Sequence, residues 1–270
     1  MKHGTFPAKL VFATSLLLAA LSQPASAITI NLSLSGLTTS QASFFTQAQS
    51  FWESVLIGYK PGINIPGITI NAAGAAIDGV GGTLGQAGPA FVTNQGGFTL
   101  TTEGNMTFDS ADLANLETNG SLEDVILHEM AHVLGFGTLW TANSVYVNGS
   151  GQYTGTNGLA MWQTEFNQPG ATFVPVELGG SAGTANGHWD ENNGGAGLTG
   201  VTDGSGNDMR NELMTGWLNT PAFISNTTKM SFMDIGYDVA IVPLPAAMWL
   251  FASGSGVFFG IAFRRSQSPG

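Results

Sequence analysis

Hydrophobic and polar positions along the chain predict one long amphipathic helix followed by a set of short strands. From residue 38 to residue 59 the apolar side chains recur at helical spacing, and Lys60-Pro61-Gly62 is expected to end this helix. The segments that follow are β-prone and separated by Gly, Asn and Pro; they span residues 67–71, 75–80, 90–93, 98–102 and 105–108. Together they predict a small twisted sheet.

A second helix is predicted at residues 121–134. Ser121 is expected to act as its N-cap with Asp124 as the acidic partner of a capping box, and Gly135 is expected to end it. The segment 141–211 is rich in Gly, Asn and Thr, so we expect long loops with short strands there. The predicted fold class is α+β, with an N-terminal subdomain at 28–137 that includes the second helix and a loop-rich subdomain at 138–241.

Residues 1–27 have the pattern of a secretory signal peptide. Lys2 and Lys9 lead into an apolar run at 10–21, and Ala25-Ser26-Ala27 supplies the small residues of a cleavage site. The alternative, a buried core helix, fits poorly because the run is short and is followed by Gln23-Pro24. We therefore expect export, with a mature chain that begins near Ile28.

The segment 242–270 predicts a membrane span or a sorting signal. Val242-Pro243-Leu244-Pro245 precedes 18 uncharged residues, 246–263, and Arg264-Arg265 follows. At about 1.5 Å per residue the uncharged stretch reaches roughly 27 Å, close to a bilayer core, with the arginines on the cytoplasmic side. The segment resembles the PEP-CTERM sorting signal of Gram-negative bacteria, which implies an exosortase-type processing enzyme. A permanent anchor is the alternative, and both place the rest of the chain in the cell envelope or outside the cell.

Composition narrows the classes of protein further. The 270 residues are 43% hydrophobic and 9% charged, and the 38 glycines follow no collagen period, so the chain is expected to be globular. Between residues 28 and 241 three basic residues stand against 18 acidic ones, a formal charge of −15, which argues against nucleic-acid binding. The chain has no cysteine, which excludes disulfides, thiolate metal sites and a cysteine nucleophile.

The second predicted helix contains His128-Glu129-Met130-Ala131-His132, an HExxH motif. Residues at i and i+4 lie on one helix face, so both imidazoles are able to reach one zinc ion. Glu129 would then stand beside water that the metal activates. The alternative is an accidental match, which the rarity of His and Glu in this chain disfavours.

Catalytic zinc takes three protein ligands, so a third ligand is required. His188, in Asn186-Gly187-His188-Trp189-Asp190, is the only other histidine after residue 27. A carboxylate is the alternative to His188 as the third ligand. The available carboxylates are Glu165, Glu177, Asp190 and Glu212.

The string from His128 to Phe136 resembles the metzincin metallopeptidases, although their third-histidine position holds Thr138 here. The segments His188-Trp189 and Glu212-Leu213-Met214 resemble motifs of the leishmanolysin family, in which a long insertion precedes the third ligand. The segments 104–109 and 232–237 also look like bacterial members of that family. The protozoan members are rich in cysteine, unlike this chain, and residues 194–208 enlarge the spacing from His188 to Met214.

The resemblance implies a zinc endopeptidase that acts on protein or peptide substrates. His128, His132 and His188 would hold zinc, and Met214 would be the Met-turn residue beneath the metal. Glu129 would take a proton from the attacking water and pass it to the leaving amine. The substrate is expected to extend along an edge strand, which we place at 105–108.

Two further sets of residues have side chains that are able to bind a metal. Asp203, Ser205, Asn207 and Asp208 alternate in a Gly-rich loop as calcium ligands do, but the match to an EF-hand is partial and a solvated turn is the alternative. Tyr237 is expected to be a packed strand-end tyrosine rather than an extra metal-site phenol.

The sequence is also compatible with three other functions. One is a catalytically silent, metzincin-like binding module with structural zinc, and another is a surface or biofilm structural protein of the cell envelope or extracellular matrix. The third is a zinc hydrolase of non-peptide bonds, since HExxH specifies the metal better than the bond. The intact Glu129 and the absence of cysteines, which are the ligands that typically close a structural zinc site, favour the peptidase.

Overall fold

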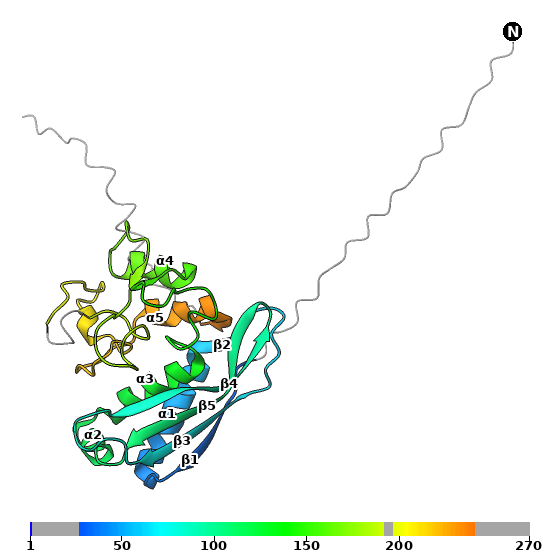
Figure 1. The fold of residues 1–270 in the computed structure, drawn as a ribbon. Coiled ribbons are helices and arrows are strands. Elements are labelled where there is room, and N and C mark those ends of the chain that lie inside the picture. The colour runs from blue at the N-terminus through cyan, green and yellow to red at the C-terminus, as the bar shows by residue number, and fades with distance from the viewer. Residues whose placement is uncertain (2–26, 192–196, 241–270) are drawn as a thin grey trace, which may run out of the picture.

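The computed structural model describes residues 1, 27–191 and 197–240. Within these ranges the chain is a mixed α+β protein with a small mixed sheet, so the coarse fold class predicted from the sequence is confirmed (Figure 1). The predicted signal peptide, apart from residues 1 and 27, and the predicted C-terminal sorting segment lie outside the described residues. No helix in the described ranges is long and apolar enough to cross a membrane.

The main sheet has four strands in the spatial order β1-β3-β5-β4. Strands β1, β3 and β5 run parallel, whereas β4 pairs antiparallel with β5 and forms one edge of the sheet. Their bounds are β1 Ile30–Ser35, β3 Ile68–Ala75, β4 Gly85–Gln95 and β5 Phe98–Asp109. Ile68, Ile70 and Ala72 alternate with more exposed residues along β3, so one face of the sheet is buried.

Two helices, α1 (Thr39–Val55) and α3 (Leu122–Leu134), pack against each other, and α3 also packs on β4 and β5 (Figure 1). The Trp52 indole of α1 donates a 3.1 Å hydrogen bond to the Leu127 carbonyl of α3. A Cβ atom on Gly104 of β5 would lie 2.3 Å from a Val133 methyl, so glycine is what allows α3 to lie this close to the sheet. A short helix, α2 (Leu113–Asn119), precedes α3.

The first helix is shorter than its sequence pattern predicts. It starts as expected, with a capping box between Thr38 and Gln41, but it ends at Val55 rather than at residue 59. The next residues form strand β2 (Leu56–Tyr59), which pairs with β8 (Tyr237–Val239) near the end of the described chain. Pairing with a distant strand overrides the local helical spacing there.

The predicted strands also change in extent. Residues 75–80 are not a strand beyond Ala75, whereas 90–93 is part of the longer β4, and 98–102 and 105–108 are one continuous strand, β5. The expected edge strand at 105–108 is therefore wrong, because β5 lies between β3 and β4. Gly88 and Gly104, which suggested interruptions, lie within paired strand, where hydrogen bonds to the partner strand maintain the extended backbone.

The C-terminal half is mostly loops, as predicted, but it also contains helices that the sequence pattern did not indicate. These elements are β6 (Gln152–Tyr153), α4 (Thr156–Glu165), β7 (Val174–Pro175), α5 (Asn226–Ser231) and the 3-10 turns η2 (Met209–Asn211) and η3 (Phe232–Ile235). Fully buried aromatic rings form its core: Phe136, Trp140, Tyr153, Trp189 and Phe232. This cluster joins the end of α3 to the segment that carries His188.

Candidate metal centre

Helix α3 carries the HExxH motif and ends as predicted. Gly135 is its C-cap with φ +113°, a left-handed conformation that favours glycine, and it reverses the chain behind His132. The predicted capping box at the other end is wrong. Ser121 has a helical backbone, with φ −98° and ψ −5°, and its side chain makes no capping hydrogen bond.

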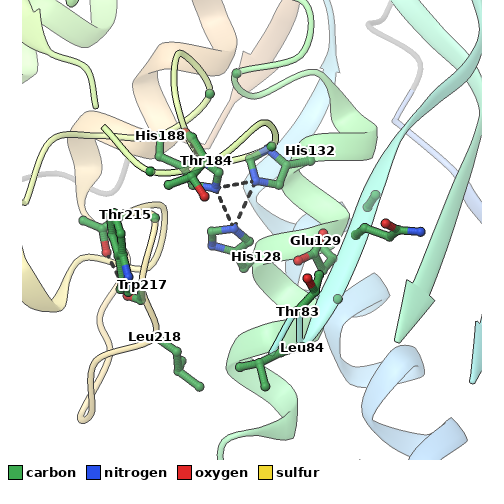
Figure 2. Close-up of a pocket in the computed structure, with 18 of the residues that line it drawn as sticks. Thr83, Leu84, His128, Glu129, His132, Thr184, His188, Thr215, Trp217 and Leu218 are labelled. Atoms are coloured by element: carbon green, nitrogen blue, oxygen red, sulfur yellow. Dashed lines mark hydrogen bonds between the residues drawn. The ribbon is translucent and has the colours of Figure 1, made fainter. Parts of the chain in front are cut away.

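The structure brings His128, His132 and His188 together although His188 lies 56 residues beyond the helix pair (Figure 2). The three Nε2 atoms form a triangle in which each pair is 3.0 Å apart. His132 and His188 are buried, with 7% and 5% of their surface exposed, and His128 is half-buried. These side chains are close enough to bind one metal ion.

The other ring nitrogen of each histidine makes a hydrogen bond to the backbone. Nδ1 of His128 donates to the Leu213 carbonyl at 2.7 Å, Nδ1 of His132 to Phe136 at 3.0 Å and Nδ1 of His188 to Thr184 at 2.7 Å. A carbonyl oxygen only accepts, so each Nδ1 carries the proton and each neutral ring turns an unprotonated Nε2 toward the other two. Three acceptors that face one another in this way repel unless a cation lies among them.

Burial disfavours additional protons on these rings. It lowers the pKa of His128 and of His132, and it lowers the pKa of His188 to about 3, with the neighbouring imidazoles acting in the same direction on His132 and His188. Nitrogens about 2.1 Å from a tetrahedral ion lie about 3.4 Å apart, slightly wider than this triangle. The three Nε2 atoms therefore fit a divalent ion that prefers imidazole ligands, provided that the rings move slightly apart.

Two of the carboxylates considered as third ligands have other roles. Glu165 accepts four hydrogen bonds from Asn226 and Thr227 at the start of α5. Glu212 is 2% exposed and accepts hydrogen bonds from Met214, Ser225 and Thr228. Within the described ranges, the group of side chains that could hold a metal consists of the three histidines.

Glu129 lies on α3 beside the two helix histidines and lines the same cleft (Figure 2). It is 7% exposed, and burial raises its pKa to about 8. Gly85, the first residue of β4, packs on it closely enough that an added Cβ would lie 2.9 Å from Cγ of Glu129. A cation held by the histidines would lower this pKa again by Coulomb attraction.

A cleft of about 940 Å³ runs over the histidines and opens to solvent. Helix α3 contributes Asp124, Val125, His128, Glu129 and His132 to its surface. Figure 2 shows Thr83 and Leu84 on the side where β4 begins, and Thr215, Trp217 and Leu218 on the opposite side. The cleft is large enough for an extended chain rather than for a water molecule alone.

Met214 lies in a turn whose backbone accepts hydrogen bonds from His128 and from Trp189, the residue that follows His188. It is fully buried, and its carbonyl accepts from the Trp189 amide at 3.0 Å, next to His188. The preceding carbonyl, Leu213, is the acceptor for His128. No sequence pattern predicts the roles of Leu213, Phe136 and Thr184, because every residue has a backbone carbonyl that is able to accept a hydrogen bond.

Thr138 and Tyr237 have structural contacts. The Thr138 hydroxyl donates to the His132 carbonyl at 2.7 Å, and Tyr237 is 1% exposed and donates to the Leu134 carbonyl at 2.9 Å. Both hydrogen bonds stabilise the C-terminal turn of α3. The placement of Tyr237 matches the expectation of a packed strand-end tyrosine.

In the loop considered for calcium, the carboxylates accept local hydrogen bonds. Asp203 accepts from the amides of Ser205 and Asn207, and Asp208 accepts from Thr199, Gly200 and Arg210. Within the described ranges, no group of three acidic or histidine ligands forms around this loop. The geometry is that of a turn stabilised by its own side chains.

The comparisons with known proteins add no family. No protein-family model matches the chain, and no curated protein matches it. A functional assignment therefore rests on the geometry of the three histidines and Glu129, together with the motifs in the sequence.

Proposed function

We propose that the chain is an exported zinc-dependent endopeptidase of the leishmanolysin-like metzincin type. The observation that carries the proposal is the convergence of three imidazole Nε2 atoms beside a buried glutamate in an open cleft. Three neutral imidazoles with fixed tautomers are a donor set that suits zinc. The leishmanolysin-like motifs in the sequence, which imply that Met214 is the Met-turn residue, support the proposal as well.

His128, His132 and His188 would hold the zinc ion. Bound zinc supplies Lewis acidity, which polarises a carbonyl and lowers the pKa of water. The three backbone acceptors keep each ring in one orientation, so the site is organised before an ion arrives.

Glu129 would act as the general base and acid. Its carboxylate lies in the cleft on the same helix as His128 and His132, where it is able to take a proton from attacking water and give it to the leaving amine. The packing of Gly85 against Glu129 limits the side-chain positions open to that carboxylate.

The substrate would extend along β4. This strand is hydrogen-bonded to β5 on one side and forms the edge of the sheet, and Gly85, Gln86 and Ala87 line the cleft. An extended peptide that adds to this edge by β-augmentation would pass beside Glu129. We propose this strand in place of 105–108.

Export and sorting belong to the proposal on sequence grounds. The signal-peptide pattern at 1–27 and the PEP-CTERM-like segment at 242–270 would deliver the chain to the cell envelope or outside the cell, with an exosortase-type enzyme as processing partner.

A catalytically silent binding module with structural zinc is the second candidate. Such a site is expected to be closed by a fourth protein ligand. Within the described ranges the metal-binding group has three members and faces an open cleft, which favours catalysis.

The deciding experiment is cleavage of an unfolded protein by the purified chain, with and without a zinc chelator. Glu129→Ala is expected to retain zinc and lose turnover, and Asp124→Asn, one helical turn before His128, is the control for a change of charge on the same surface. Chelator-sensitive cleavage that zinc restores would support the peptidase. A folded, zinc-loaded protein without cleavage would favour the binding module.

A further inference from the structure

Glu212 is a buried carboxylate with an unusual set of partners. It is 2% exposed, and the ion pairs of the described residues do not include it. Burying a carboxylate without a cationic partner is costly unless hydrogen bonds stabilise it. The acid must therefore be held by the groups around it.

Four hydrogen-bond donors contact the Glu212 carboxylate. Oε1 accepts from the Ser225 amide at 2.9 Å, the Ser225 hydroxyl at 2.8 Å and the Thr228 hydroxyl at 2.6 Å. Oε2 accepts from the Met214 amide at 2.5 Å. Burial raises the pKa of Glu212, and the four hydrogen bonds act against this effect because a carboxylate that only accepts satisfies all four donors.

These hydrogen bonds reach two of the three histidines. Oε2 fixes the Met214 amide, and the peptide before it carries the Leu213 carbonyl that accepts from His128. The Met214 carbonyl accepts from the Trp189 amide, beside His188. Glu212 thus holds the turn whose two carbonyls set the position of His128 and of the His188 segment.

A second chain of hydrogen bonds links Glu212 to the segment that carries His188. The Trp189 indole donates to the Thr228 hydroxyl at 2.8 Å, so that hydroxyl gives its own hydrogen to Glu212. The backbone and the ring of Trp189 are therefore both tied to groups that Glu212 contacts.

We propose that Glu212 is a positioning residue of the metal centre, which sets the orientation of His128 and His188 through the turn 212–214. The inference rests on the proposed metal site and deepens it. Outer partners of metal-binding histidines typically change metal affinity 10- to 100-fold when they are altered. The residue acts through the backbone and touches neither the ion nor the substrate.

Glu212→Gln tests this role sharply because it changes one group. The amide oxygen would stay with the three donors at the Oε1 position, and the NH2 group would then face the Met214 amide, where two donors repel. The turn should shift while α5 keeps its contacts. Glu165→Gln is the matched control, since Glu165 accepts four hydrogen bonds at the start of the same helix and has no hydrogen bond to the turn.

The measurements are Zn²⁺ affinity by competition, the visible absorption spectrum with Co²⁺, and the melting temperature of the metal-free chain. We expect Glu212→Gln to bind Zn²⁺ about 10- to 100-fold more weakly and to change the Co²⁺ spectrum. Glu165→Gln should lower the melting temperature but keep both metal readouts. Unchanged affinity and spectrum in Glu212→Gln, or equal losses in both variants, would overturn the proposal.

Ser225→Ala covers the case in which Glu212→Gln does not fold. It removes one donor to Glu212, and its effect on the Co²⁺ spectrum should exceed that of Glu165→Gln; equal spectra would reject the role. The metal readouts do not depend on peptidase activity. If the wild-type protein binds Zn²⁺ but cleaves no substrate, the proposed function is rejected and the positioning role of Glu212 is not affected. If the wild-type protein does not bind Zn²⁺, both proposals are rejected.

Discussion

Gly137 lies directly against Gly187, and a Cβ atom on Gly137 would be 2.2 Å from the Gly187 carbonyl oxygen. Gly137 has φ +70° and follows the turn that ends α3, whereas Gly187 immediately precedes His188. The absence of a side chain at Gly137 is what allows the distant loop to bring His188 to the helix.

We predict that Gly137→Ala displaces the His188 loop. The methyl group would meet backbone, which has little room to move, and the positive φ adds about 1 to 2 kcal/mol of strain. Zn²⁺ affinity, measured by competition with a chromogenic chelator, should fall at least 10-fold. Gly120→Ala is the control because Gly120 also has a positive φ, +81°, but an added Cβ there has open space. Equal metal affinity in the two variants would contradict the prediction.

Metal removal should lower stability by mass action. At a free Zn²⁺ concentration 100 times the Kd, binding stabilises the folded chain by about 2.7 kcal/mol. For a domain of this size, that corresponds to a melting temperature about 5 to 10 °C higher than with chelator. The two midpoints should nearly coincide in His188→Ala, as scanning fluorimetry would show; a zinc-dependent shift that persists in this variant would place the ion elsewhere.

Tyr237 and Tyr59 form a matched pair for testing buried hydroxyl groups. Their rings are 5.3 Å apart and both are buried, but Tyr237 donates to the Leu134 carbonyl, whereas the Tyr59 hydroxyl has no hydrogen-bond partner among the described residues. Tyr237→Phe should cost about 1 kcal/mol of unfolding free energy, and Tyr59→Phe should be neutral or stabilising. Urea denaturation measures both. Loss of zinc in Tyr237→Phe would instead make this phenol part of the metal site.

The lowered pKa of Asp109 predicts that the stability of the chain depends on pH. Backbone hydrogen bonds from Ala111, Gly79 and Asp78 lower the pKa of its carboxyl below the ordinary value of 3.8. Its contribution is therefore present above pH 3.8 and is lost as the pH falls through the lowered pKa. Asp109→Asn should be less stable than wild type at pH 7, and the gap should narrow toward pH 3. Urea midpoints of the metal-free chains measure it, and a gap that stays constant with pH would contradict the assignment.

Local sequence determined the helix that carries His128, Glu129 and His132. Its apolar positions, the i to i+4 spacing of the histidines and the glycine stop at Gly135 are properties of 15 consecutive residues, and a helix forms from contacts this close in the chain. The α+β class followed for the same reason, because a run of strand-prone segments lies between two helical segments in the sequence.

Only the tertiary structure decided how distant segments meet. The end of the first helix at Val55, the position of β4 at the edge of the sheet and the approach of His188 to α3 depend on pairings between segments far apart in the chain. The carbonyls that orient the histidines are backbone groups, which every residue possesses, so no residue pattern marks them. The sequence therefore determined which side chains are available to a metal centre, and packing determined which of them come within reach of one ion.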